Sequence, residues 1–297
     1  MTAPDFIPFG GDEVRPVSFD EAQIVVLPLC YEHAASYGEG SQDGPLHLLN
    51  ASAQLEGVDE ETMTDWADLA IHTLPPVFPP KNPEAAIDQM RAAADRVLAQ
   101  GKFLLSLGGD HAVSLGPIQA TARRHPRIGV LQVDAHLDLR DEWNGSRYNH
   151  ACIMRRVADD MALPFVQVGI RSFSREEAQY VKTKGLAPFY AHEIAAISEA
   201  FSGSGPENWI EQVVNRLPEQ VYLTLDLDGL DPAVLPGTGT PEPGGLTYRQ
   251  VVRLLQAVGR NRRVIAADIN ELVKIPGTQV SEFTAAKLAA KIFVYCT

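Results

Sequence analysis

The stretch IGVLQVDAHLDLR, residues 128–140, decides the fold class of this chain. It begins as a mostly apolar run, IGVLQV, as expected of a strand that is buried on both faces. It ends in Asp134, His136 and Asp138, which alternate with apolar residues. Alternate side chains of an extended chain point to one side, so we expect these three to converge at the carboxyl end of a buried strand, where α/β sheets bind ligands.

A cluster of unpaired carboxylates at such a strand end is costly, and a metal ion would remove that cost. The alternative is a polar strand end whose carboxylates only cap neighbouring backbone groups. We favour a metal site, which requires further ligands from other parts of the chain.

Apolar runs alternate with longer helical patterns along the whole chain. Strands are expected at residues 23–29, 102–106, 128–133, 165–169, 221–225 and 264–269. Helices are expected at residues 83–100, 114–124, 151–160, 175–184, 206–217, 247–258 and 283–295. This alternation predicts an α/β fold with a mainly parallel sheet covered by helices. Because no low-complexity linker or internal repeat divides the chain, we predict a single domain over residues 1–297.

Composition narrows the class of partner. The chain has 297 residues, 25 Lys plus Arg and 38 Asp plus Glu, for a net charge of −13. This charge disfavours nucleic acid and anionic membranes as partners, because both repel a negative surface. The three cysteines form no CxxC motif, and we find neither a signal-peptide pattern nor an apolar run long enough to span a membrane. A cytoplasmic location is therefore predicted.

A second strand end carries carboxylates in the string VYLTLDLDGLDP, residues 221–232. Asp226 and Asp228 are expected to share one face where the apolar run ends. Asp231 precedes a proline, and Asp-Pro is a pair that initiates turns, so we assign Asp231 to local turn chemistry.

A third strand end, FLLSLGGDH at residues 103–111, closes the set of candidate ligands. Its two glycines permit a tight turn that delivers Asp110 and His111. The three strand ends together supply four carboxylates and two imidazoles: Asp134, Asp138, Asp226, Asp228, His111 and His136. Six such ligands suit two adjacent divalent ions, and oxygen-rich ligation without thiolate favours Mn²⁺. Two ions lower the pKa of a shared water, which predicts hydrolysis without a covalent enzyme intermediate.

These motifs give the sequence a resemblance to the ureohydrolase family, which includes arginase and agmatinase. The matching strings are GGDH (108–111), DAHLD (134–138) and DLDGLDP (226–232), with further matches at SYGEGSQDGP (36–45), GIRS (169–172), GTGTPEPGGLT (237–247) and FTAAKLAAKI (283–292). The resemblance covers most of the chain. It implies a three-layer α/β/α fold with a central, mostly parallel sheet of about eight strands.

The resemblance also implies a metal centre of two Mn²⁺ ions per subunit. One ion would take His111, Asp134, Asp138 and Asp226, and the other would take Asp134, His136, Asp226 and Asp228. Asp138 would also handle the proton of the attacking water. A homo-oligomer, either a trimer or a hexamer, is expected from the same resemblance.

Two further positions match catalytic residues of the family. His150 corresponds to the histidine that carries a proton to the departing amine, and Glu271 to the glutamate that pairs with the substrate guanidinium. Without the resemblance, His150 would be a surface histidine at a helix start and Glu271 a solvated strand-end residue. Ala151 stands where the family commonly has glycine. Asp268 is expected to be structural or to support a ligand from behind.

The substrate predicted from this resemblance is agmatine, cleaved to putrescine and urea, a step of polyamine biosynthesis. Residues 139–149 do not match the arginase loop that binds the amino acid end of arginine, and the strings at 36–41 and 169–172 are more like agmatinase. Guanidinobutyrate, guanidine, arginine and formiminoglutamate remain open, as does a non-catalytic regulatory homologue. Glu32, Tyr37 and Trp143 are candidates to face the substrate tail.

Two other mechanisms are alternatives to hydrolysis at a pair of metal ions. Cys152 lies two residues from His150 and could attack a guanidine as a thiolate, although cysteine is more often a packing residue. The string LDLDG, residues 225–229, could supply the aspartyl nucleophile of a phosphatase, but that would leave the other two motifs unexplained.

Overall fold

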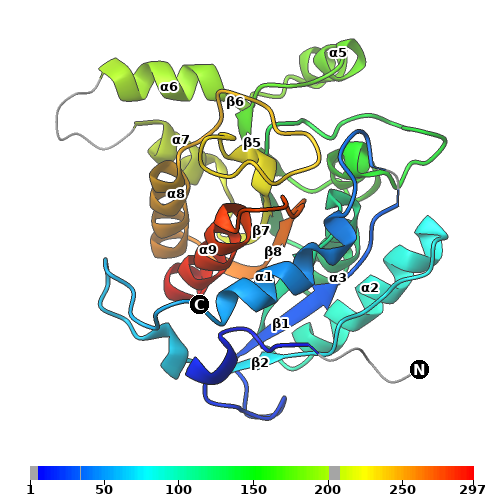
Figure 1. Cartoon of the computed structure of the whole chain (residues 1–297). Helices are drawn as coiled ribbons and strands as arrows, with labels where there is room; N and C mark the ends of the chain where they lie inside the picture. The colour runs from blue at the N-terminus through cyan, green and yellow to red at the C-terminus, as the bar shows by residue number, and fades with distance from the viewer. Residues whose placement is uncertain (1–5, 34, 201–207) are drawn as a thin grey trace.

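A computed structural model describes residues 6–33, 35–200 and 208–297 of the chain. In this part, eight strands form one sheet in the order β2-β1-β3-β8-β7-β4-β5-β6, and all neighbouring strands are parallel (Figure 1). The strands are β1 Ile24–Leu29, β2 Ile71–Thr73, β3 Phe103–Gly108, β4 Ile128–Val133, β5 Phe165–Ile170, β6 Phe189–Tyr190, β7 Gln220–Asp226 and β8 Arg263–Asn270. The predicted parallel sheet of about eight strands is confirmed.

Helices cover both faces of this sheet (Figure 1). They are α1 Gly44–Ser52, α2 Pro83–Leu98, α3 Leu115–Arg124, α4 Ile153–Arg155, α5 Arg175–Lys184, α6 Ala191–Ala200, α7 Asn208–Arg216, α8 Tyr248–Asn261 and α9 Val280–Cys296. One apolar core contains side chains of α1, α7, α8 and α9, and a second contains side chains of α2, α3 and α4. Two cores separated by a sheet make the three-layer α/β/α fold that the resemblance implies. None of the described helices combines the length and apolarity needed to cross a membrane.

All six predicted strands are present, but the two at the edges of the sheet, β2 and β6, were not predicted. Helices α1 and α6 were also missed. The helix expected at residues 151–160 is a 3₁₀ turn, His150–Cys152, then α4 and a π turn, Arg156–Asp160. The helix expected at 206–217 is described from Asn208, because residues 206 and 207 lie outside the described part.

The strand order explains why residues far apart in the sequence meet. Strands β3, β8, β7 and β4 are consecutive in the sheet, and their pairing is parallel. Val133 at the end of β4 pairs with Leu225 of β7, and Asp226 pairs with Asn270 of β8. The residues that follow these strands therefore emerge side by side at one edge of the sheet.

The glycine pair at the end of β3 is required by close packing. A Cβ on Gly109 would lie 2.0 Å from the carbonyl oxygen of Tyr31, and one on Gly108 would lie 1.9 Å from Oδ1 of Asn270. Neither glycine has a positive φ. Close approach of Tyr31 and Asn270, and not a left-handed backbone, therefore requires glycine at these two positions.

Candidate metal centre

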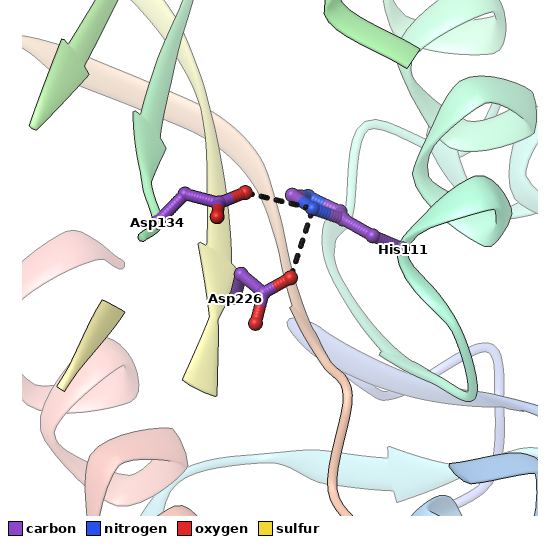
Figure 2. Close-up of side chains that lie close together, drawn as sticks. All are labelled: His111, Asp134 and Asp226. Carbon is purple, nitrogen blue, oxygen red and sulfur yellow. Dashed lines mark ion pairs between the residues drawn. The ribbon is translucent and has the colours of Figure 1, made fainter. Parts of the chain in front are cut away.

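The first cluster of ligand-type side chains surrounds the imidazole of His111. Its Nδ1 lies 3.1 Å from one carboxylate oxygen each of Asp134, Asp138 and Asp226. Figure 2 shows Asp134 from the end of β4 and Asp226 from the end of β7 pointing toward this ring. All four side chains are almost fully buried. The structure thus brings together the four residues expected at one ion.

The second cluster shares Asp134 with the first. Nδ1 of His136 lies 3.0 Å from Oδ2 of Asp228 and 3.5 Å from Oδ1 of Asp134. The atoms of these three residues are close enough to hold one cation, as are those of His111, Asp134 and Asp226. Asp134 thus belongs to both of these groups, whereas Asp226 belongs to the first, and the bridging roles of both residues stay predictions.

The hydrogen bonds behind His111 fix which nitrogen faces the carboxylates. Thr224 donates its hydroxyl hydrogen to Oδ1 of Asp268 at 2.6 Å, so its oxygen accepts Nε2–H of His111 at 2.7 Å. A neutral His111 therefore carries its proton on Nε2, and Nδ1 keeps a free lone pair. That buried Nδ1 has no hydrogen-bond partner in the described structure. An orphaned lone pair among carboxylate oxygens fits a bound metal ion.

The negative charge of the buried carboxylates also favours binding of a cation. Burial would lower the pKa of His111, but the carboxylates of Asp134, Asp138 and Asp226 outweigh burial and raise it well above the ordinary value. Burial, together with Asp228 and Asp134, raises the pKa of Asp226 as well. Each carboxylate is stable in its charged form only when positive charge is close. Two divalent ions would supply that charge.

Glu271 lies beside the first cluster. Its Oε1 accepts a hydrogen bond from the backbone N–H of His111 at 2.7 Å, and its backbone N–H donates to the carbonyl of Gly109. Glu271 and Asp138 both have positive φ, 69° and 52°, and they are two of the five such non-glycine residues in the described chain. Left-handed backbone at such residues is strained and concentrates at functional sites. This strain aims both carboxylates into the pocket.

Glu271 and the cluster residues other than Asp134 line a pocket of about 320 Å³ that is also lined by His150. Nε2 of His150 lies 2.9 Å from the hydroxyl oxygen of Ser36, and its Nδ1 is buried without a partner in the described structure. Burial, with the neighbouring His136 and His111, lowers the pKa of His150 to about 4. The ring is therefore neutral at pH 7 and able to accept a proton.

Several supporting residues were not found from the sequence. Gln167 donates to the side-chain oxygen of Gln132, and Gln132 donates to Oδ2 of Asp134 at 2.6 Å. Arg171 donates to the carbonyls of Asp228, at 2.6 Å, and of several other loop residues. The motif GIRS contains Arg171, so its match to the family was the available signal.

The structure also shows which of the remaining candidate residues line the pocket and which have other contacts. Trp143 lines the pocket, whereas Tyr37 is 87% exposed and does not line it. Oε2 of Glu32 accepts three hydrogen bonds from residues 40–42, which makes it a loop anchor. Asp231 accepts from backbone N–H groups of residues 233, 244 and 245, which confirms its turn role. Cys152 is buried away from the pocket, and burial raises the pKa of its thiol to about 12, so it is a packing residue.

Comparison with known proteins agrees with this geometry. The model of the arginase family matches residues 22–295. An N(1)-aminopropylagmatine ureohydrolase of a Synechocystis species is 39% identical over 94% of this chain and 90% of its own length. An agmatinase of Pyrococcus horikoshii is 32% identical over 93% of each chain. The crystal structure of the agmatine ureohydrolase of Thermoplasma volcanium superposes with a TM-score of 0.85 at 28% identity, covering 98% of this chain and 94% of that one. The chain therefore belongs to the arginase family and is a metal-dependent amidinohydrolase.

Proposed function

We propose that this enzyme hydrolyses a linear guanidine with a cationic tail to urea and an amine at a pair of Mn²⁺ ions. The observation that carries the proposal is the free Nδ1 of His111, held among three carboxylate oxygens at 3.1 Å. The family match and the names of the relatives support the reaction class.

The proposed ligands are the six residues predicted from the strand ends: His111, Asp134, Asp138 and Asp226 for one ion, and Asp134, His136, Asp226 and Asp228 for the other. Held by these residues, two divalent ions would lower the pKa of a water molecule in the pocket, so that hydroxide would be available near neutral pH. The contribution of the protein is to hold the oxygens and imidazoles in a buried, fixed arrangement. Backbone N–H groups of Ala135 and His136 donate to Asp228 and Asp134, respectively, and keep their second oxygens in place.

Glu271 is proposed to bind the substrate guanidinium. A carboxylate and a guanidinium pair in one plane, with two parallel hydrogen bonds when both oxygens are free. Here Oε1 already accepts from the backbone of His111, so Oε2 faces the pocket as the principal acceptor. Burial, together with Asp110, raises the pKa of Glu271 above its usual range, and a bound cation would offset this effect. The charge of Glu271 is thus matched to a cationic substrate.

His150 and Asp138 are proposed to move protons. Asp138 would accept the proton of the attacking water, because its carboxylate faces the cluster from the pocket side. His150 is neutral, and its Nε2 is hydrogen-bonded to the hydroxyl of Ser36. The ring can therefore take up a proton and pass it to the leaving amine. Ser36 would orient the His150 ring.

For the substrate, we propose a guanidine attached to a four-carbon spacer with an ammonium tail. Agmatine has this structure and remains the substrate predicted from sequence. The relatives named for aminopropylagmatine, which shares the spacer, are 38–39% identical to this chain, and the first agmatinase is 32% identical. The homo-oligomer and the cytoplasmic location stay predictions.

Urea release is the decisive test. With added Mn²⁺, we expect urea from agmatine and aminopropylagmatine at least tenfold faster than from arginine, guanidinobutyrate or guanidine. Asp226→Asn should lose metal and activity, while Asp231→Asn, a matched change outside both clusters, should keep metal. Urea release that survives complete metal removal would refute the two-metal proposal. Release from none of the guanidines would favour formiminoglutamate, whose product is formamide, or a non-catalytic homologue.

A further inference from the structure

Among the described residues, the pocket lining offers no free carboxylate for the ammonium group of a short tail. Apart from the proposed metal ligands and Glu271, the charged side chains that line it in the described structure are His150, Arg140 and Glu177. Both oxygens of Glu177 are occupied, because Oε1 accepts from Leu139 N and Oε2 from Ser174 N. The tail of a bound guanidine therefore finds its ion-pair partner only beyond this pocket.

Glu242 offers a carboxylate at the pocket rim. Its Oε1 accepts the hydroxyl of Ser172, a pocket-lining residue, at 2.9 Å. Its Oε2 has no hydrogen-bond partner among the described residues, and the side chain is half-buried. Glu32 also borders the pocket, through Ser41, but its Oε2 is saturated by three donors of the 40–42 loop. Glu242 is thus the less committed of the two carboxylates.

The backbone holds Glu242 firmly in this position. Arg171 donates from Nη2 and Nε to the carbonyl oxygen of Glu242, at 2.7 and 3.3 Å, and from Nη2 to the carbonyl of Asp228. One guanidinium therefore ties the rim loop to the loop that carries a proposed metal ligand. Because Arg171 holds the backbone of Glu242 and Ser172 holds one of its carboxylate oxygens, the side chain would bind a ligand with little loss of conformational entropy.

Aromatic side chains flank the same exit. Phe173, next to Ser172, lines the pocket and is 42% exposed. Trp143 lines it from the opposite loop and carries the Arg140 guanidinium 4.0 Å above its ring centre. Trp143 stands at a tight hairpin closed by Asn144 and Gly145, both with positive φ. Exposed aromatic faces attract ammonium groups that pass over them.

We propose that Glu242, flanked by Phe173, binds the second ammonium group of a long substrate tail, and that this contact makes the enzyme prefer aminopropylagmatine over agmatine. This inference rests on the proposed function. Agmatine ends in a single ammonium on its four-carbon spacer, whereas the aminopropyl group adds a second one further out. The longer tail therefore places a charge further from the guanidinium than agmatine can, and a carboxylate at the rim would distinguish the two.

The test compares both substrates in wild type and in Glu242→Gln. We expect the variant to lower kcat/KM for aminopropylagmatine roughly five- to tenfold, through KM, since a partly buried ion pair is lost. The kcat/KM for agmatine should stay within about twofold. Glu176→Gln removes the same charge on nearby α5, where Glu176 accepts from the backbone N–H of Asp141, and neither residue lines the pocket. This control variant should change the kcat/KM of neither substrate. Glu242→Asp should restore part of the preference.

Binding of the product amines gives a second measurement that needs no turnover. Calorimetry with spermidine, the triamine product, and putrescine, the diamine product, should show tighter binding of spermidine in wild type and a reduced ratio in Glu242→Gln. Equal losses for both substrates, or an unchanged spermidine-to-putrescine ratio, would overturn the tail contact. Absence of urea from both substrates in wild type would instead contradict the proposed function, and the amine ratio would still decide the role of Glu242.

Discussion

Replacement of Thr224 by valine should weaken metal binding without unfolding the protein. Thr224 is fully buried and stands between His111 and Asp268, at 2.7 and 2.6 Å. Valine keeps the shape of threonine and removes only the hydroxyl. The Nε2–H of His111 then loses its acceptor, whereas Asp268 keeps hydrogen bonds from Asn270 and Tyr222.

The size of the effect follows from where the imidazole proton can go. A buried N–H without an acceptor costs about 1–3 kcal/mol. The metal-free protein can escape this cost by releasing the Nε2 proton and keeping the proton on Nδ1, where Asp134, Asp138 and Asp226 each offer an oxygen at 3.1 Å. The metal-loaded protein has no such escape, because the ion needs that lone pair. We therefore expect a loss of roughly 10–100-fold in metal affinity and a much smaller loss of stability in the metal-free protein.

Competition with a chelator, read out as Mn²⁺ retained per subunit, measures the affinity, and urea denaturation of the metal-free protein measures the stability. Thr224→Ser is the matched control, because it keeps the hydroxyl and removes a methyl group. It should bind Mn²⁺ nearly as wild type does. If Thr224→Val retains Mn²⁺ within about threefold of wild type, the hydrogen bond does not set the His111 tautomer and the orientation argument fails.

Three further outcomes are expected. His150→Asn should lower kcat by roughly 10²–10⁴-fold, as for loss of a proton-transfer group, with Mn²⁺ content near wild type; metal loss would show that His150 is a ligand. Removal of metal by EDTA should abolish urea release, added Mn²⁺ should restore it, and Cys152→Ala should behave as wild type in both steps; a Cys152→Ala enzyme that alone loses activity would revive the thiolate mechanism. Lys291→Met should cost about 3–5 kcal/mol at pH 7, measured by urea denaturation, because it leaves Asp59 buried without its partner at 2.5 Å. Burial raises the pKa of Asp59, but hydrogen bonds from Lys291 and Thr62 outweigh burial and lower this pKa. The stabilisation by the Lys291–Asp59 pair is therefore present above the unfolded pKa of about 3.9 and is lost as pH falls through the pKa of folded Asp59. A cost of Lys291→Met that does not shrink below about pH 4 would contradict the pairing.

The parts of the fold that the sequence predicted are those with strong local patterns. The six predicted strands are long apolar runs in the middle of the sheet, where burial on both faces enforces the pattern. The two missed strands, Ile71–Thr73 and Phe189–Tyr190, are edge strands of three and two residues, too short for any periodicity. Helix α6 was missed because Ala191 follows β6 directly, so no turn residues mark its start.

In the candidate site, too, some residues can be recognised from local sequence patterns and others cannot. Ligand-type residues such as His136 and Asp228 are visible because they form dense polar motifs at the ends of apolar runs. The residues that orient them are not visible, because a threonine or glutamine inside a strand looks like any other strand residue. Thr224 and Gln132 act through contacts with His111 and Asp134 that only the folded sheet creates. Their roles depend on strand order, which a local pattern does not encode.

The spacing of the motifs has a different physical basis from the one assumed at the start. Asp134 and His136 were expected to share a face of an extended strand, but β4 ends at Val133, before either residue. Instead, the N–H of His136 donates to Oδ1 of Asp134 at 2.6 Å, and the N–H of Asp228 donates to Oδ1 of Asp226 at 2.9 Å. Each motif therefore forms a short turn in which the aspartate holds the residue two positions later.

This turn explains how one local pattern serves twice in the site. In the β7 motif, Oδ1 of Asp226 accepts a hydrogen bond from the backbone N–H of Asp228, and Oδ2 faces Nδ1 of His111 at 3.1 Å. Oδ1 of Asp228 in turn accepts from Ala135 N of the other motif, which leaves its Oδ2 to face His136 at 3.0 Å. Each carboxylate is fixed through Oδ1 and directs Oδ2 toward an imidazole, although Oδ2 of Asp228 also accepts a long hydrogen bond of 3.4 Å from the hydroxyl of Thr240. Because the two turns are also bonded to each other, a change in either motif should displace ligands of both ions, so the two metals are expected to be lost together.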